Sequence, residues 1–238
     1  MSEKKYSHKQ MKKLMKEDEV ATFADKTIKW MKENKTTVWG GVIVLILAVA
    51  VYVASNSYIS NKTEKSETAF SKASKIFYYA PKKGEQPKYK DKNEQYQKAL
   101  EEFKKIAEGS YTSSVKLRAK YFEALCYLNL NNVPEAEKLL KSLLNESDYP
   151  LKTPVSLCYA RILVNSGELD KAVSILDNLL KQDTYKNPVK DYELLEKSKI
   201  LVKQGKKEEA KELLNQIILD YPDSAYATDA KKEKENIS

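Results

Sequence analysis

The sequence predicts an all-α protein, with a single N-terminal transmembrane helix followed by a solenoid of about four helical hairpins and a C-terminal capping helix. Three observations support this prediction. An uncharged apolar run lies near the N-terminus, the rest of the chain is rich in Leu, Lys, Glu and Ala, and one pattern returns every 36 to 38 residues. At 238 residues, the chain is long enough to bury a core without disulfides.

The composition leaves little from which to build a catalytic or metal site. The single histidine, His8, lies in a lysine-rich tail, and two cysteines cannot form a disulfide framework. No phosphate-binding loop, nucleophile elbow or metal-ligand spacing occurs in the sequence. We therefore expect a protein that is not an enzyme, with no catalytic residues, cofactor, metal or small-molecule substrate.

The transmembrane helix is predicted over residues 36–59. Val38 to Ala54 form an unbroken stretch of apolar residues and glycine, and uncharged flanks extend it to the roughly 20 residues that a helix needs to cross a bilayer. We expect membrane lipid to contact this segment. A buried core helix and a cleaved signal peptide are the alternatives, but the 37 residues that precede the stretch favour an uncleaved anchor.

Residues 1–35 are expected to form a cytoplasmic tail that contains a basic amphipathic helix. Lysines are more frequent in the dozen residues before the apolar stretch than after it, where only Lys62 and Lys65 occur, and this bias places the N-terminus in the cytoplasm. Four apolar residues and one threonine in the tail recur at helical spacing among the lysines, as in a basic amphipathic helix. These positions are Val20, Phe23, Thr27, Trp30 and Met31.

An internal repeat occupies the rest of the chain. Ala99, Ala136, Ala172 and Ala210 each begin a similar stretch, and the separations between them are 37, 36 and 38 residues. A period in this range indicates stacked helical hairpins. Each hairpin needs two helices and a turn, so turn and capping residues predict where the helices begin and end.

The first hairpin is atypical, because a basic, proline-containing loop at residues 80–92 separates its two helices. We interpret this loop either as a solvated insertion or as a contact loop for the membrane or a partner. In the third hairpin, Thr153-Pro154 predicts a helix start with a capping hydroxyl. The remaining expected elements are helices near 65–79, 94–108 and 115–129, turns at Asn131-Asn132, Asn165-Ser166-Gly167 and Gln204-Gly205, a helix start at Asn187-Pro188, and a capping helix and tail over 223–238.

The hairpins after the first resemble tetratricopeptide repeats. Counting the shared alanine as the twentieth position of the family pattern, a small residue stands twelve positions earlier and a large one four positions later. The small residues are Ala124, Ala160 and Ser198, and the large ones are Leu140, Leu176 and Leu214. The resemblance implies a repeat domain over residues 62–222 that binds proteins and not nucleic acid.

The resemblance also implies that the first helices of successive hairpins form a concave binding surface. Arg, Lys and Asn side chains with Tyr between them suit an extended peptide and its acidic groups, while a solvated polar face without a ligand is the alternative. The candidate groove residues are Arg118, Tyr121, Asn129, Leu157, Arg161, Asn165, Tyr192, Lys199 and Lys203. Cys126 and Cys158 lie on neighbouring first helices and are expected to be buried, with a disulfide between them as the alternative.

The order of segments resembles that of the ancillary subunits of the bacterial Sec translocon. Members begin with a cytoplasmic acidic and aromatic segment, here Glu17-Asp-Glu-Val-Ala-Thr-Phe-Ala24, and a Lys/Asn flank, here Lys32-Glu-Asn-Lys35. The resemblance implies a single-pass protein of the bacterial inner (plasma) membrane with a periplasmic or extracytoplasmic C-terminal domain. It implies a scaffold that assists export or folding of secreted proteins, with translocon subunits, periplasmic chaperones or exported clients as partners.

Two other functions stay open at this point. One is a periplasmic scaffold for cell-envelope or division machinery, and the other is a cytosol-facing tetratricopeptide receptor on a membrane. The net charge of +8 does not favour nucleic acid, because the excess lies in residues 1–37 and 62–92, on both sides of the predicted membrane helix.

Overall fold

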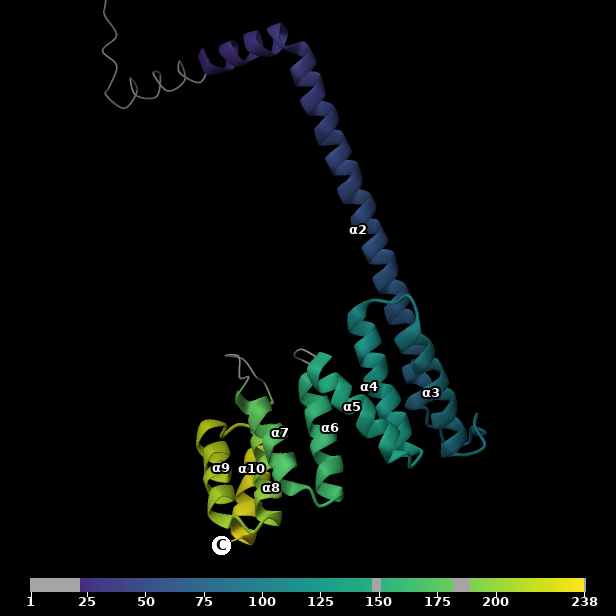
Figure 1. Ribbon diagram of the computed structural model, residues 1–238, viewed down its shortest axis with the longest axis vertical. Coiled ribbons are helices and arrows are strands. Elements are labelled where there is room, and N and C mark those ends of the chain that lie inside the picture. Colours follow the sequence, from purple (N-terminus) through teal and green to yellow (C-terminus); the bar gives the residue numbers. More distant parts are fainter. Residues whose placement is uncertain (1–21, 147–150, 182–188, 238) are drawn as a thin grey trace, which may run out of the picture. The chain divides into compact units, whose positions relative to one another are not determined.

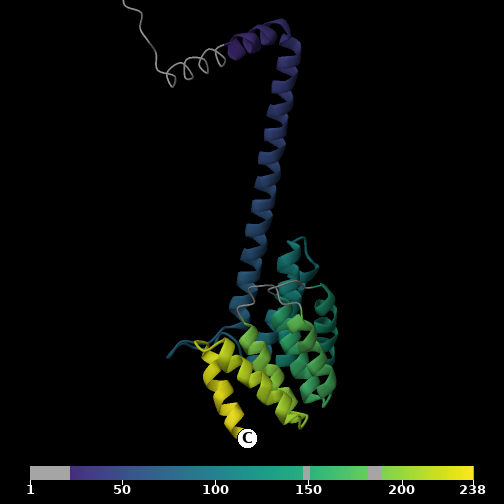
Figure 2. The same cartoon turned by 90° about the vertical axis from the view of Figure 1, so that its left-hand side faces the viewer.

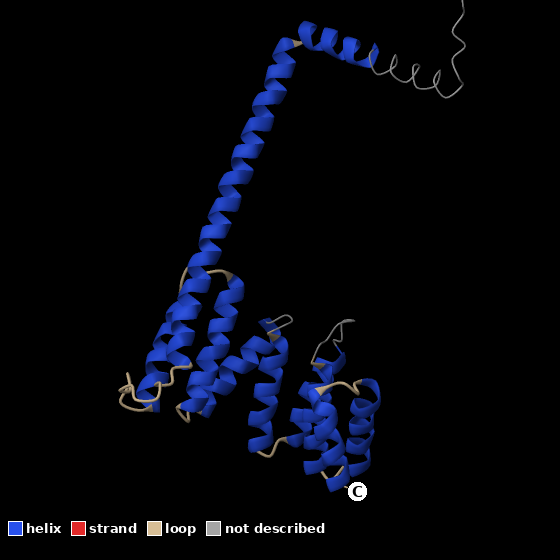
Figure 3. Cartoon of the chain, turned by 180° about the vertical axis from the view of Figure 1, so that it is seen from behind, coloured by secondary structure: helices blue, strands red, loops and turns tan. Residues whose placement is uncertain are grey.

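The computed structural model describes residues 22–146, 151–181 and 189–237, and every regular element in these ranges is a helix (Figures 1 and 3). The chain divides into two compact units, Met1–Asn61 and Lys62–Ser238. The predicted all-α class is confirmed.

The first unit contains a helix over residues 22–33 and the beginning of the long helix α2 (Lys35–Phe77). A turn at Asn34 joins them, and the hydrogen bonds from the Asn34 amide to the Trp30 carbonyl and from the Val38 amide to the Asn34 carbonyl bridge that turn. Large apolar side chains along α2, such as Leu45, are exposed. Among the described residues, α2 is the one helix long and apolar enough to cross a membrane, which is consistent with a single-pass anchor or a signal sequence.

Helix α2 does not end where the apolar stretch ends. The sequence predicted a membrane helix and a separate first repeat helix near residues 65–79, but the structure has one continuous helix from Lys35 to Phe77. The residues between Ala54 and Lys65 are mostly polar, yet they include neither glycine nor proline, so nothing in the backbone requires a break. Polarity changes along this helix while its backbone conformation continues.

The second unit consists of antiparallel helices that follow one another in space as they do in sequence (Figures 1 and 2). The last part of α2 packs against α3 through a shared apolar cluster, after which α4 and α5, α6 and α7, and α8 and α9 form the later hairpins. The bounds are α3 (Lys92–Glu108), α4 (Ser113–Asn129), α5 (Val133–Glu146), α6 (Lys152–Asn165), α7 (Leu169–Lys181), α8 (Lys190–Lys203), α9 (Lys207–Asp220) and α10 (Ala225–Asn236).

The repeat register predicted from the alanines is correct. Ala99, Ala136, Ala172 and Ala210 are all fully buried, and the large residues four positions later are fully buried as well. A methyl side chain at these points allows the two helices of a hairpin to approach closely. The buried large residues are Phe103, Leu140, Leu176 and Leu214.

The predicted hairpin turns are also present. Gly167 and Gly205 have φ values of 79° and 77°, and Asn131 has a φ of 58°. These left-handed conformations favour Gly and Asn and stop each first helix so that the chain can reverse. The predicted start at Asn187-Pro188 lies outside the described residues.

The predicted capping role of Thr153 is wrong. Helix α6 begins at Lys152, one residue earlier, and the Thr153 hydroxyl instead donates to Oε1 of Glu193, at 3.0 Å. Thr153 is buried and Glu193 is fully buried, so the hydroxyl stabilises a carboxylate of the next hairpin in place of the end of its own helix. Pro154 still lies in the first turn, where its missing amide hydrogen costs nothing.

Helix α10 packs against α9 and α8 at the end of the stack. Ser224 is its N-cap and accepts a hydrogen bond from the Tyr226 amide at 2.9 Å. Ala230 and Ile237 join the core of the last hairpin, and the opposite face of α10 is polar and exposed. This arrangement covers the apolar side of the last repeat, as terminal helices of repeat proteins do.

Candidate functional site: a groove between two first helices

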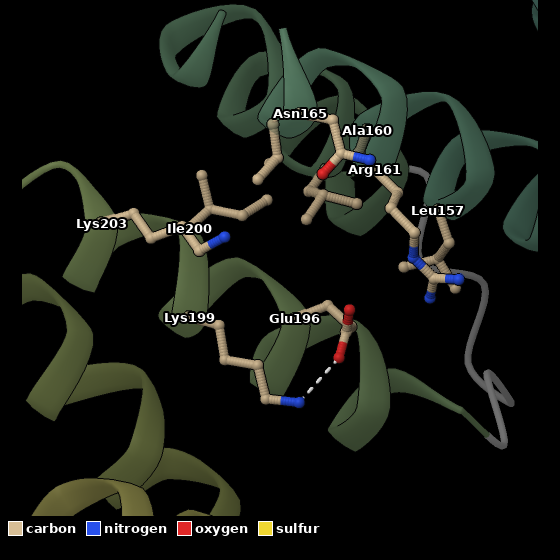
Figure 4. Close-up of a pocket in the computed structure, with 10 residues that line it drawn as sticks. Leu157, Ala160, Arg161, Asn165, Glu196, Lys199, Ile200 and Lys203 are labelled. Carbon is tan, nitrogen blue, oxygen red and sulfur yellow. Dashed lines mark hydrogen bonds and ion pairs between the residues drawn. The ribbon is translucent and has the colours of Figure 1, made fainter. Parts of the chain in front are cut away.

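A groove of about 190 Å³ lies between α6 and α8, the first helices of two neighbouring hairpins (Figure 4). Its floor is apolar. Leu176 of α7 is fully buried, and Ala160 and Ile200 are 3% and 7% exposed. The small Ala160 side chain leaves the space above the floor open, because a larger residue there would fill it.

Cationic side chains line the rim of the groove. Arg161 comes from α6, and Lys199 and Lys203 come from α8. Lys199 Nζ lies 2.9 Å from Oε1 of Glu196, one turn earlier on the same helix (Figure 4). No ion pair of Arg161 or Lys203 is found within residues 22–146, 151–181 and 189–237, so the lining carries three positive charges against one negative charge.

Lys199 remains protonated at neutral pH. Partial burial alone would lower its pKa, but the hydrogen bond to Glu196 and nearby carboxylates outweigh burial and raise the pKa of Lys199 above its usual value. The groove therefore presents fixed positive charge beside an apolar floor. Its volume is below the range of about 300–1,000 Å³ typical of small-molecule sites, and it suits one or two side chains of an extended peptide.

Five of the nine predicted groove residues line this one groove. They are Leu157, Arg161, Asn165, Lys199 and Lys203. The prediction missed Glu196, although its spacing of three residues from Lys199 places both on one helix face. It also missed the apolar floor, because Leu176 and Ile200 match the core pattern of the repeats.

None of the three predicted groove residues on α4 lines this groove, and two of them, Arg118 and Asn129, form polar contacts elsewhere. The two terminal nitrogens of Arg118 lie 3.1 and 2.9 Å from the carboxylate oxygens of Glu67, and the guanidinium stacks 4.0 Å from the ring centroid of Phe70. Arg118 therefore joins α4 to α2. Asn129 is exposed, and its Nδ2 donates to the Leu125 carbonyl at 2.8 Å.

The two predicted tyrosines form contacts within the repeat stack. Burial raises the pKa of Tyr121 to about 12, so its phenol is neutral. Tyr192 stacks on Tyr226 of α10, with ring centroids 4.9 Å apart. Tyr121 also packs against the core cluster of the middle hairpins, so both tyrosines contribute to helix packing and neither lines the groove.

Both cysteines are free thiols, Cys126 buried and Cys158 partly exposed. Burial raises the pKa of Cys126 to about 12 and also raises the pKa of Cys158. Neither thiol is therefore activated as a nucleophile. Within the described ranges, no three His, Cys, Asp or Glu residues are grouped so that they could hold a metal ion.

Comparison with known proteins gives a family match over most of the chain. The sequence pattern of the tetratricopeptide repeat-like domain family matches residues 28–231. No curated protein matches the chain significantly.

Solved structures of tetratricopeptide proteins are similar to this chain. A variant of a putative kinesin light chain from Podosopora anserina, with nearly identical tetratricopeptide-like repeats, is 17% identical at a TM-score of 0.50. The match covers 72% of this chain and 88% of that one. YrrB, a tetratricopeptide protein with an unusual peptide-binding site, is 22% identical over 58% of this chain and 67% of its own, with a TM-score of 0.44. The chain belongs to the tetratricopeptide repeat-like domain family, whose repeat domains are scaffolds for protein–protein interaction.

Proposed function

We propose that this protein is a membrane-anchored scaffold that binds extended segments of other proteins in the groove between α6 and α8. The observation that carries the proposal is the convergence of Arg161, Lys199 and Lys203 from two helices above one apolar floor. Cations around an apolar hollow recognise a chain that places an apolar side chain inward and acidic or carbonyl groups toward the rim.

The charge of the groove narrows the class of segment. With three cations and one carboxylate, the rim attracts acidic groups and repels basic ones. The small volume selects side chains of moderate size, such as Leu or Val, over a folded surface. An unfolded or extended protein segment can place an apolar side chain in the groove and acidic groups at its rim without first having to unfold.

The finer proposal is a single-pass protein of a bacterial inner membrane whose repeat domain faces the periplasm and assists newly exported proteins beside the Sec translocon, together with periplasmic chaperones. Its support is the resemblance in segment order, with the Lys32-Glu-Asn-Lys35 flank before the apolar part of α2. The apolar part of α2, which is exposed and long enough to cross a bilayer, is the expected form of such an anchor.

In-cell photo-crosslinking tests the proposed partners. A photoreactive residue in place of Arg161 or Lys203 should capture translocon subunits, chaperones or exported clients. The same residue in place of exposed Lys138 on α5, outside the groove, is the matched control. Recovery of division proteins alone from the groove positions would overturn the translocon assignment, and equal capture from Lys138 would overturn the groove as the site.

A topology reporter tests the orientation. Alkaline phosphatase fused after Ser238 should be active, because this enzyme works only outside the cytoplasm, whereas a reporter that is active only inside should be silent. The opposite pair of results would place the repeats in the cytosol and contradict the proposed location.

A further inference from the structure

The connection between α2 and α3 is held in a defined conformation by side-chain contacts. Gln95, near the start of α3, is only 2% exposed. Its Nε2 atom lies 2.8 Å from the carbonyl oxygens of Ile76 and Phe77 and 3.1 Å from that of Tyr79. The last carbonyls of a helix lack partners within the helix. A side chain of α3 therefore caps α2 and holds both ends of the connection together.

Two tyrosines fix the course of the connection between these ends. The rings of Tyr79 and Tyr89 meet edge to face with centroids 5.1 Å apart, and Tyr89 is 7% exposed. The Lys88 amide donates to the Tyr79 hydroxyl at 2.9 Å. The ring contact with the buried Tyr89 and the hydrogen bond from the Lys88 amide together hold the partly buried Tyr79 against the far end of the loop.

Both acidic residues of the segment take part in its own turns. Glu85 accepts from the Lys82 amide at 3.2 Å across a turn in which Gly84 has a φ of 88°. Asp91 is the N-cap of α3 and accepts from the Glu94 amide at 2.8 Å. In the described part of the chain, neither carboxylate forms an ion pair with a lysine of the segment.

The lysines of the segment are therefore left facing solvent. Residues 80–92, which we call the basic loop, contain five lysines and two acids. Lys92 directs Nζ to the Tyr79 carbonyl and to Oε1 of Gln95. The other four are exposed, and none forms an ion pair with a described residue. They are Lys82, Lys83, Lys88 and Lys90.

We propose that the basic loop is a preformed contact surface for an acidic segment of a partner protein, separate from the groove between α6 and α8. Its charge complements a negative partner and adds to the association rate as well as to affinity. Its anchored backbone means that little conformational entropy is lost when the partner binds. The proposal concerns residues outside the groove and does not depend on what the groove binds.

An anionic lipid surface is the other chemistry that could attract these lysines. Attraction to lipid needs only a density of positive charge near the surface, and a flexible lysine tail supplies it. The contacts of the buried Gln95 and Tyr89 instead fix the backbone that carries the four exposed lysines, which favours a partner with a matching pattern of acids. The experiment must therefore distinguish lipid binding from binding of a protein segment.

The test uses the full chain in nanodiscs of zwitterionic phosphatidylcholine. The probe is a fluorescent peptide of about ten glutamates, and a glutamine peptide of equal length is its control. The loop variant changes Lys82, Lys83, Lys88 and Lys90 to Glu. A remote variant with the same change in charge converts four exposed lysines elsewhere, Lys138, Lys207, Lys231 and Lys232, to Glu. A groove variant combines Arg161→Glu and Lys203→Glu.

We expect the loop variant to weaken binding of the glutamate peptide by about tenfold or more, and the remote variant to change it by less than about twofold. Affinity of the unmodified chain should fall between about 0.05 and 0.5 M salt, as screening increases. Equal weakening in the loop and remote variants would mean general charge attraction and would overturn the proposal. Weakening in the groove variant alone would also overturn it, and would leave the proposed groove function standing.

A vesicle flotation assay distinguishes binding of an acidic protein segment from binding of anionic lipid. The same nanodiscs are mixed with vesicles that contain about 30% phosphatidylglycerol. Flotation that depends on the four loop lysines, without loss of peptide binding in the loop variant, would assign the basic loop to lipid and overturn the proposal. Peptide binding that depends on these lysines, with flotation unchanged, is the expected result.

Discussion

Phe103 on α3 offers a direct test of how the first hairpin is stabilised. Its side chain is fully buried four residues after Ala99, and its ring centroid lies 5.0 Å from that of Phe122 on α4 and 5.6 Å from that of Phe70 on α2. Replacement of Phe103 by Ala would therefore leave a cavity in contact with three helices. The cavity could not be filled by water without further cost, because its walls are apolar.

The expected loss is about 4 kcal/mol. Phe→Ala substitutions in cores cost about 3–5 kcal/mol, and complete burial with two close ring partners excludes the lower end of that range for Phe103. The loss should also be local. The buried residues around Phe103 form a cluster with α2 and α4 that is separate from the cluster of α9 and α10. In a repeat stack each hairpin depends on its neighbours, so distant hairpins keep their stability.

Native-state hydrogen exchange of the full chain in nanodiscs measures this loss helix by helix. Amides of α3 and α4 should lose about 4 kcal/mol of protection, and those of α9 and α10 less than about 0.5 kcal/mol. Phe103→Leu should cost about 1.5 kcal/mol, and Leu219→Ala, at a position that is 76% exposed, should change little. A loss below about 1 kcal/mol in α3, or an equal loss in α9, would refute the reasoning.

Three further outcomes follow from individual residues. Burial raises the pKa of Glu123 above its usual value. As pH rises, the unfolded chain therefore loses this proton at a lower pH than the folded chain does. The free energy of unfolding falls between the ordinary glutamate pKa and the raised one. Glu123→Gln should therefore raise Tm at about pH 7 and leave it nearly unchanged at about pH 4, while Glu212→Gln, at an exposed position in the middle of α9, should shift neither. Burial raises the pKa of Cys126 to about 12, so iodoacetamide at about pH 8 should label this thiol only in denaturant. Peptide mapping measures the labelling. Labelling of Cys126 in the native protein would contradict its burial. Gly167→Ala should cost about 1–2 kcal/mol in chemical denaturation because its φ of 79° disfavours a side chain, whereas Asn131→Gly should cost nothing; equal costs would contradict the turn geometry.

The sequence was sufficient for the features that depend on local patterns. The buried alanines repeat at a nearly constant period, and a small residue at that place has one structural meaning, so the helix pairs and their register could be predicted. The groove followed in part for the same reason. Leu157, Arg161 and Lys203 fall on the inner face once the register is correct.

Features that depend on long-range pairing could not be predicted from local patterns. Thr153 has the pattern of an N-cap, but its hydroxyl finds a buried carboxylate 40 residues away at Glu193. Arg118 matches a groove position, but Glu67 lies within reach because α2 continues into the first hairpin. In both cases a partner that is distant in the sequence competes with the local preference, and the buried or bidentate contact prevails.

The order of contacts along the second unit has a consequence for how the chain folds. Among the described helices from α3 onward, substantial contacts join each helix to the next one in the chain, and beyond these only α6 with α8 and α8 with α10. Such a low contact order means that no helix waits for a distant segment to be synthesised, and loop closure costs little entropy. Each hairpin can close while the next one is still being made and waits only for that neighbour to cover its remaining apolar face, which limits the time in which the nascent chain can aggregate.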